Sequence, residues 1–90
     1  MPDRMLDLDC GIAYERIEQW LSEGLGLSCD GTCWVFYEGD QTCCIQLERL
    51  EPRMHSLIGL ERTRLLAEGD AAALERFERL FTLRFLSAGG

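Results

Sequence analysis

The chain contains no lysine and no asparagine, and its only histidine is His55. Without lysine it can form no lysine Schiff base, and it cannot build the lysine-dependent phosphate loop of nucleotide-binding proteins. His55 follows Pro52 in an expected turn, and nothing in the sequence pairs it with a cysteine, so we expect a surface residue without a catalytic role. A non-enzymatic function is therefore favoured over an enzymatic one.

Long apolar runs are also missing, since no stretch approaches the ~20 residues that a membrane-spanning helix needs. Residues 1–9 lack the basic and apolar regions of a secretory signal. We therefore expect no membrane partner and a cytoplasmic location, in which thiols stay reduced. The odd count of five cysteines also fits poorly with a complete set of disulfides within the chain.

Positive charge is scarce, because nine arginines face sixteen acidic residues and give a net charge of −7. Nucleic-acid binding depends on cationic contacts to phosphates, and anionic membranes also attract cations. The charge therefore argues against both kinds of partner. It suits a soluble protein whose partner carries a basic patch.

Two segments show the hydrophobic spacing of amphipathic helices. The first runs from about residue 11 to 23, with Asp9 as its expected N-cap, and residues 1–9 offer at most a brief edge strand. The second begins at about residue 71, with Asp70 as its N-cap. Residues 82–86 can continue this helix or form a final strand, and periodicity does not decide between the two.

The middle of the chain predicts antiparallel strands at 25–29, 33–37, 42–50 and 56–68, with Pro52 ending the third of them. A two-residue turn at Gly39 and Asp40 places Phe36 opposite Cys43 and Trp34 opposite Ile45. One face of the sheet is then apolar and should pack against the helices. We expect one α+β domain over residues 1–90, with two helices on one face of a three- to four-stranded antiparallel sheet, in the order α-β-β-β-α.

The second face of this sheet carries the candidate binding residues Cys33, Val35, Tyr37 and Cys44. A partly apolar face that no helix covers is a common place for a protein partner or for a second copy of the chain. We therefore expect a small acidic binding or adaptor protein that uses no cofactor and acts through this face or as a homodimer.

A competing hypothesis rests on the cluster of four cysteines at positions 29, 33, 43 and 44. Adjacent strand residues point to opposite faces, so Cys43 and Cys44 should not share one ion. Cys33 and Cys44 lie diagonally on one face, roughly 7–8 Å apart at Cα, and could bind zinc with Cys29 as a third ligand, or serve redox chemistry. The simpler interpretation is that these cysteines are small buried apolar residues.

Three local patterns resemble known families. The terminal Gly89-Gly90 resembles the tail of ubiquitin-like sulfur carriers, although those proteins begin with a hairpin rather than a helix. The order helix, three strands, helix is similar to the double-stranded-RNA-binding domain, whose basic second helix is here offset by acids. Residues 12–50, with a helix, an Asp30-Gly31 turn and a hairpin, resemble the acidic secretion chaperones, which are dimers that hold an unfolded segment of another protein.

Overall fold

The computed structural model describes residues 4–55 and 58–86, and for Arg4, Arg53, His55 and Ile58 it describes the backbone alone. The strands are β1 (Arg4–Cys10), β2 (Cys29–Asp30), β3 (Cys33–Glu38), β4 (Gln41–His55) and β5 (Ile58–Gly69). The helices are α1 (Tyr14–Gln19), which continues as the π-helical segment Trp20–Gly24, and α2 (Ala71–Phe81), which continues as the π-helical segment Thr82–Leu86. Residues 82–86 thus extend the second helix.

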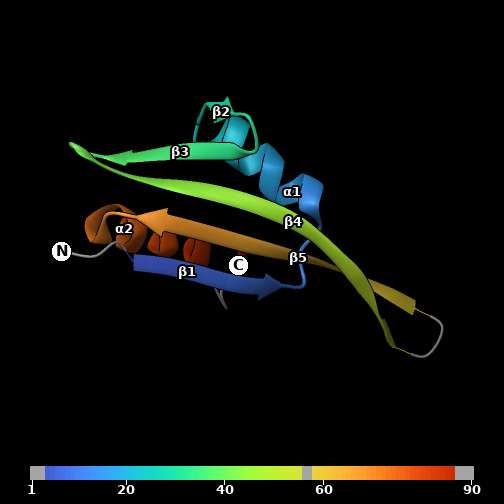
Figure 1. The fold of residues 1–90 in the computed structure, drawn as a ribbon. Helices are drawn as coiled ribbons and strands as arrows, with labels where there is room; N and C mark the ends of the chain where they lie inside the picture. The colour runs from blue at the N-terminus through green and yellow to red at the C-terminus, as the bar shows by residue number, and fades with distance from the viewer. Residues whose placement is uncertain (1–3, 56–57, 87–90) are drawn as a thin grey trace.

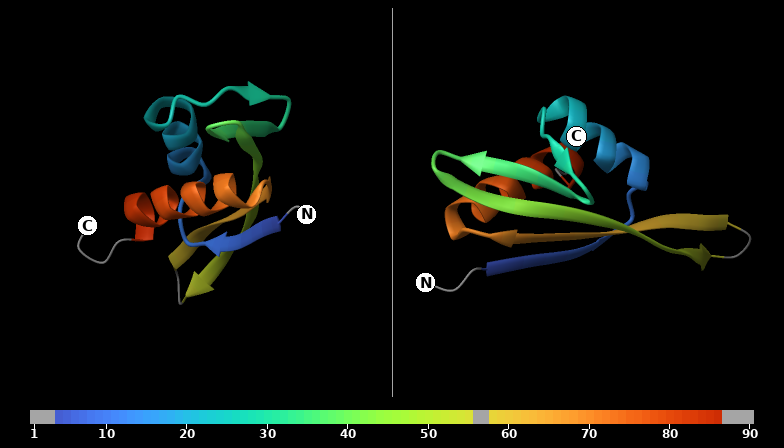
Figure 2. Two further views of the ribbon diagram at one scale, coloured as in Figure 1. Left: turned by 90° about the vertical axis from the view of Figure 1, so that its left-hand side faces the viewer. Right: turned by 45° about the horizontal axis from the view of Figure 1, so that its top comes forward.

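The strands form one antiparallel sheet in the order β1-β5-β4-β3-β2. Both helices lie on the same side of this sheet (Figures 1 and 2). The predicted α+β class, with one antiparallel sheet and two helices, is confirmed. The predicted strand count was too low because the N-terminal segment is a full strand.

Residues 1–9 were expected to offer at most a brief edge strand and to end in a helix cap at Asp9. The edge strand is present and is longer than expected, but the prediction that Asp9 caps the helix was wrong. Residues 4–10 pair along their whole length with β5, and α1 begins only at Tyr14, with Ala13 at the N-cap position. The partner strand lies more than fifty residues away in the sequence, and there Arg64 and Arg62 of β5 pair with Asp7 and Asp9. Asp9, which suggested a helix start, is therefore paired with Arg62 within the sheet.

Two other boundaries differ from the predictions. The short strand expected at 25–29 is reduced to Cys29–Asp30. Pro52 does not end β4, because a bulge between Leu50 and Arg53 absorbs the residue that cannot donate a backbone hydrogen bond. As a result the β4–β5 hairpin extends past the ends of the other strands and projects from the body of the protein (Figure 1).

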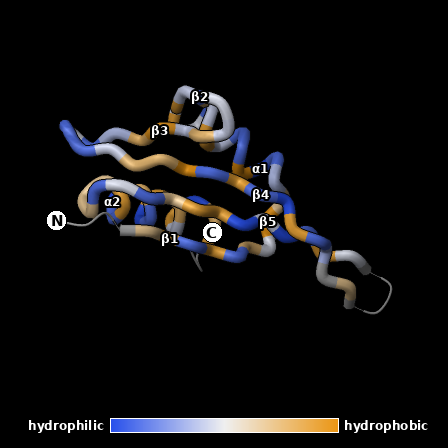
Figure 3. Tube along the Cα trace, viewed as in Figure 1, coloured by the Kyte–Doolittle hydropathy of each residue, from blue (hydrophilic) through white to orange (hydrophobic). Residues whose placement is uncertain are grey.

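The predicted pairing of the central hairpin is confirmed, since Trp34 lies opposite Ile45 and Phe36 opposite Cys43. These four side chains are buried together with residues of β5 and both helices. Hydrophobic and hydrophilic residues alternate along most of β1, as expected when one face of a sheet is buried (Figure 3). One part of the core is a cluster of aromatic rings whose centroids lie 5.1 to 6.3 Å apart, formed by Trp20, Phe36, Phe77, Phe81 and Phe85.

Asp70 holds the expected N-cap position of α2, but its carboxylate does not cap the helix. That carboxylate accepts a hydrogen bond from the backbone N–H of Thr42 at 2.9 Å, and the side chain of Gln41 accepts one from the N–H of Ala72 at 3.2 Å. The start of β4 and the start of α2 therefore cap each other. Gly69 makes this crossing possible, since a Cβ at this position, where φ is +146°, would lie 2.5 Å from the Thr42 carbonyl oxygen.

Thr63 is a buried polar residue, fully shielded from solvent in β5. Its hydroxyl donates a hydrogen bond of 2.6 Å to the carbonyl of Ile12. This bond ties the centre of the sheet to the segment between β1 and α1. A buried carbonyl without a donor costs about 1–3 kcal/mol.

We predict that Thr63→Val, which keeps the shape and removes the hydroxyl, lowers the free energy of unfolding by about 1–2 kcal/mol. Urea denaturation of the purified protein measures this change. Thr63→Ser is the matched control, because it keeps the donor and loses only a methyl group. Equal stability of the valine variant and the parent would show that the bond to Ile12 contributes nothing.

Candidate functional site

The face of the sheet away from the helices is the candidate site, which we call the open face. Side chains directly opposite each other in an antiparallel sheet point the same way, so register assigns its members. One row crosses four strands, from Val35 through Cys44 and Glu68 to Met5. Along each strand, every second residue counted from this row has its side chain on the same face.

One end of the open face is apolar. This apolar patch consists of Met5, Val35, Tyr37, Leu66 and the cysteine pair Cys33 and Cys44. Met5 and Tyr37 are each 66% exposed, while the other members are half-buried. A hollow of about 150 Å³ opens within the patch, lined by Met5, Cys44, Gln46, Leu66, Ala67 and Glu68. No helix within the described residues covers this surface.

The other end of the open face is charged. Arg64 lies between Asp7 and Glu48, with its nitrogens 2.9 Å and 3.6 Å from their carboxylate oxygens. Hydrogen bonding from Arg64 lowers the pKa of Asp7 below its usual range. Charges of opposite sign therefore alternate from β4 through β5 to β1, and the row ends in an acid at the edge of the sheet.

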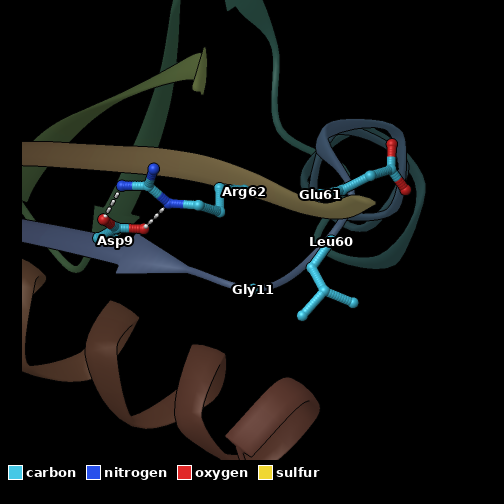
Figure 4. A pocket seen from close by; sticks show the side chains of 5 residues that line it. All are labelled: Asp9, Gly11, Leu60, Glu61 and Arg62. Carbon is cyan, nitrogen blue, oxygen red and sulfur yellow. Dashed lines mark hydrogen bonds and ion pairs between the residues drawn. The ribbon is translucent and has the colours of Figure 1, made fainter. Parts of the chain in front are cut away.

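A second ion pair lies at the far end of this charged region. The guanidinium of Arg62 makes two parallel contacts with the carboxylate of Asp9, the shorter at 2.5 Å (Figure 4). Beside it lies a cavity of about 270 Å³, which is lined by Asp9, Gly11, Leu60, Glu61 and Arg62. Leu60 points away from the ion pair, past the end of β1 (Figure 4). Within this cavity Asp9 and Arg62 neutralise each other.

Of the residues predicted for this face, the structure brings Cys33 and Cys44 together in a disulfide. Their Cα atoms are 5.9 Å apart, within the range of disulfides and closer than the 7–8 Å expected for a diagonal pair. The right-handed twist of a sheet shortens one of its two diagonals. The expectation that the thiols stay reduced therefore does not describe this pair. The diagonal placement already present in the sequence register was the signal for the disulfide.

Cys29 does not join this pair. It lies opposite Trp34 in the register, so it faces the side of the helices, whereas Cys33 and Cys44 lie on the open face. Its exposed thiol donates a hydrogen bond to the carbonyl of Gly31 at 3.2 Å. Among the described residues, no group of three or more histidine, cysteine, aspartate or glutamate side chains is arranged to hold a metal ion. A zinc site of Cys29, Cys33 and Cys44 stays a prediction, and it requires that the disulfide be reduced.

The two remaining cysteines, Cys10 and Cys43, are buried in the core. Burial raises the pKa of the Cys43 thiol to about 11, with a further contribution from the negative charge of Asp70. Burial likewise raises the pKa of Cys10, helped by Asp9. Both thiols therefore stay protonated and unreactive at neutral pH, as expected of small apolar core residues.

Other predicted features lie outside what the structure describes. The side chain of His55 is one of them, although its backbone belongs to β4. The terminal glycines Gly89 and Gly90, on which the sulfur-carrier resemblance rests, are outside the described residues. None of the helices in the described part of the chain is long and apolar enough to span a membrane.

Comparison of the chain with known protein families, with curated proteins and with solved structures finds no match in any of the three.

Thiol labelling should separate the cysteines into three classes. In the native protein purified without reductant, we predict that Cys29 reacts rapidly with iodoacetamide, because it alone of the free cysteines is exposed. Cys10 and Cys43 should react only after unfolding, and Cys33 and Cys44 only after unfolding and reduction. Peptide mass spectrometry reads the order directly. Rapid native labelling of Cys43 would contradict the buried, protonated state.

The disulfide should contribute strongly to stability, because it closes a loop between residues eleven positions apart. A loop of this size corresponds to about 3 kcal/mol of unfolded-state entropy. We predict that the double variant Cys33→Ser, Cys44→Ser loses about 2–3 kcal/mol in urea denaturation. Cys29→Ser is the control and should change stability by no more than ~0.5 kcal/mol. If the two variants have the same free energy of unfolding, the disulfide does not stabilise the folded protein.

Proposed function

We propose that this protein is a small acidic adaptor that binds a partner protein through the open face of its sheet. The observation that carries the proposal is the apolar patch, where Met5 and Tyr37 are each 66% exposed and Met5 lines a hollow in the sheet surface. Singly exposed apolar residues are ordinary on protein surfaces. A contiguous patch bordered by charged residues is typical of an interaction site.

Rigidity favours the same surface. The disulfide joins β3 to β4 within the patch, and the core rings pack against the opposite side of the same sheet. A preformed surface loses little conformational entropy when a partner binds. The patch is therefore better suited to docking than the exposed apolar residues of the projecting β4–β5 hairpin.

Charge favours a basic partner over a second copy. The chain carries a net charge of −7, the exposed Glu68 lies between Cys44 and Met5, and the exposed Glu48 lies at the charged end of the face. Two copies of the same acidic surface repel each other, whereas a cationic surface is attracted and steered towards it. The homodimer expected from the sequence remains an alternative occupant of the same face.

The test compares two charge insertions at equally exposed apolar positions. Tyr37→Glu places an acid in the patch, and Leu83→Glu places one on the outer surface of the second helix, where Leu83 is 63% exposed. With the parent and both variants as baits in native-host lysate, we predict a protein retained by the parent and by Leu83→Glu and lost, by ~tenfold or more, with Tyr37→Glu.

Salt supplies a second readout, because a cationic partner should dissociate as ionic strength rises. Equal retention by Tyr37→Glu and Leu83→Glu would overturn the proposal. A parent dimer in sedimentation velocity that only Tyr37→Glu converts to a monomer would assign the face to a second copy instead of a basic partner.

A further inference from the structure

The two outer edges of the sheet differ in how well they could pair with a further strand. At one end, β2 is only two residues long and covers little of β3. Beyond the end of β3, the outer edge of β4 carries Pro52 and a bulge, both of which discourage pairing with another strand. At the other end, β1 runs for seven residues in unbroken register with β5 and contains no proline. Among the described strands, β1 offers the longest stretch of outer edge in unbroken register.

Register shows which backbone groups face this outer edge. The N–H of Val35 donates to Ser28 on the far side of β3, so the Val35 backbone points away from β4. In an antiparallel sheet the direction alternates from strand to strand along one row, so the backbone of Cys44 points to β5 and that of Glu68 points to β4. Met5 ends the same row and therefore points away from β5.

Two residues along β1, the backbone of Asp7 points outward for the same reason. The side chain of Asp7 is turned the other way, because Arg64 holds both of its oxygens at 3.1 and 2.9 Å. Charged side chains at a sheet edge ordinarily discourage pairing. Here the charge is drawn inward over the sheet, and the backbone groups of Met5 and Asp7 face a side of the sheet on which no described strand lies.

The flanking side chains define what a sixth strand should contain. On the open face the charges run from Glu48 to Arg64 to Asp7, so an arginine or lysine opposite Asp7 continues the alternation. On the opposite face, Leu6 and Leu8 are half-buried at the rim of the core and would pack against apolar residues. A second copy fits less well, because antiparallel self-pairing centred on Asp7 or Leu8 sets aspartates of the two copies opposite each other.

We propose that the edge of β1 binds an extended segment of a partner protein in which basic and apolar residues alternate, and that this segment adds to the sheet as a sixth strand. The inference rests on the proposed function, since it names the form of the partner's segment. It uses a separate surface, the backbone edge, and so can fail independently of the apolar patch.

The probe is an acetylated and amidated heptapeptide of alternating arginine and valine, with a glutamate-for-arginine peptide as its control. In amide hydrogen exchange followed by NMR, the arginine peptide should slow exchange at Met5 and Asp7. The amides of Leu6 and Leu8, which point to β5, should already be protected without peptide. The glutamate peptide should bind at least ~tenfold more weakly by calorimetry.

A matched pair of variants separates strand addition from charge attraction. Asp7→Pro and Asp7→Thr both remove the carboxylate, but only proline removes the outward N–H, and a proline whose N–H would face solvent is tolerated on an edge strand. We expect Asp7→Pro to bind the arginine peptide ~tenfold more weakly than Asp7→Thr. Circular dichroism and urea denaturation confirm that both variants fold.

Equal binding by the two variants, or unchanged exchange at Met5 and Asp7, would overturn the inference. Loss of the lysate partner with Tyr37→Glu but not with Asp7→Pro would leave the proposed function standing and reject the edge. Self-association of the parent that is lost in Asp7→Pro and kept in Asp7→Thr would assign the edge to a second copy and reject the basic segment.

Discussion

The pairing of β4 with β5 determines where nearly every other part of the protein lies. These are the two longest strands, and β1 and β3 add to their two outer sides. Because side chains alternate along each strand, this one register decides which residues enter the core and which form the open face. A slip of one residue would bury Arg64 and expose Leu65, so the charge of the arginines and the apolarity of the leucines together fix the register.

Much of this arrangement follows from local sequence. The Gly39-Asp40 turn fixed the pairing of Phe36 with Cys43, and the aromatic spacing from residue 71 defined the second helix. The prediction failed where a distant partner decides the structure. Asp9 resembles a helix cap until Arg62 is placed beside it. Periodicity contains no information about such a pair, because it describes neighbours along the chain and not across a sheet.

The candidate site was predicted only in part, again because contacts within one hairpin can be inferred from sequence and contacts between distant strands cannot. Val35, Tyr37, Cys33 and Cys44 lie in one hairpin, so local register sufficed to place them on one face. Met5 and Leu66 were not predicted, since their positions depend on the pairing of β5 with β1 and with β4. The disulfide was not predicted because the Cα atoms of diagonal residues in an untwisted sheet are too far apart for an S–S bond. The twist of this sheet brings the Cα atoms of Cys33 and Cys44 close enough.

The disulfide also links the two interpretations of the cysteines. When oxidised, Cys33 and Cys44 staple β3 to β4 and leave a rigid, partly apolar surface between Tyr37 and Met5. Disulfides persist in oxidising compartments and are reduced in the cytosol. In the cytosol the same surface would present two thiols on one face, with Cys29 facing the other side of the sheet. A metal site would then require β2 to turn, whereas a docking surface requires no movement, and this difference favours the binding function over the metal-binding one.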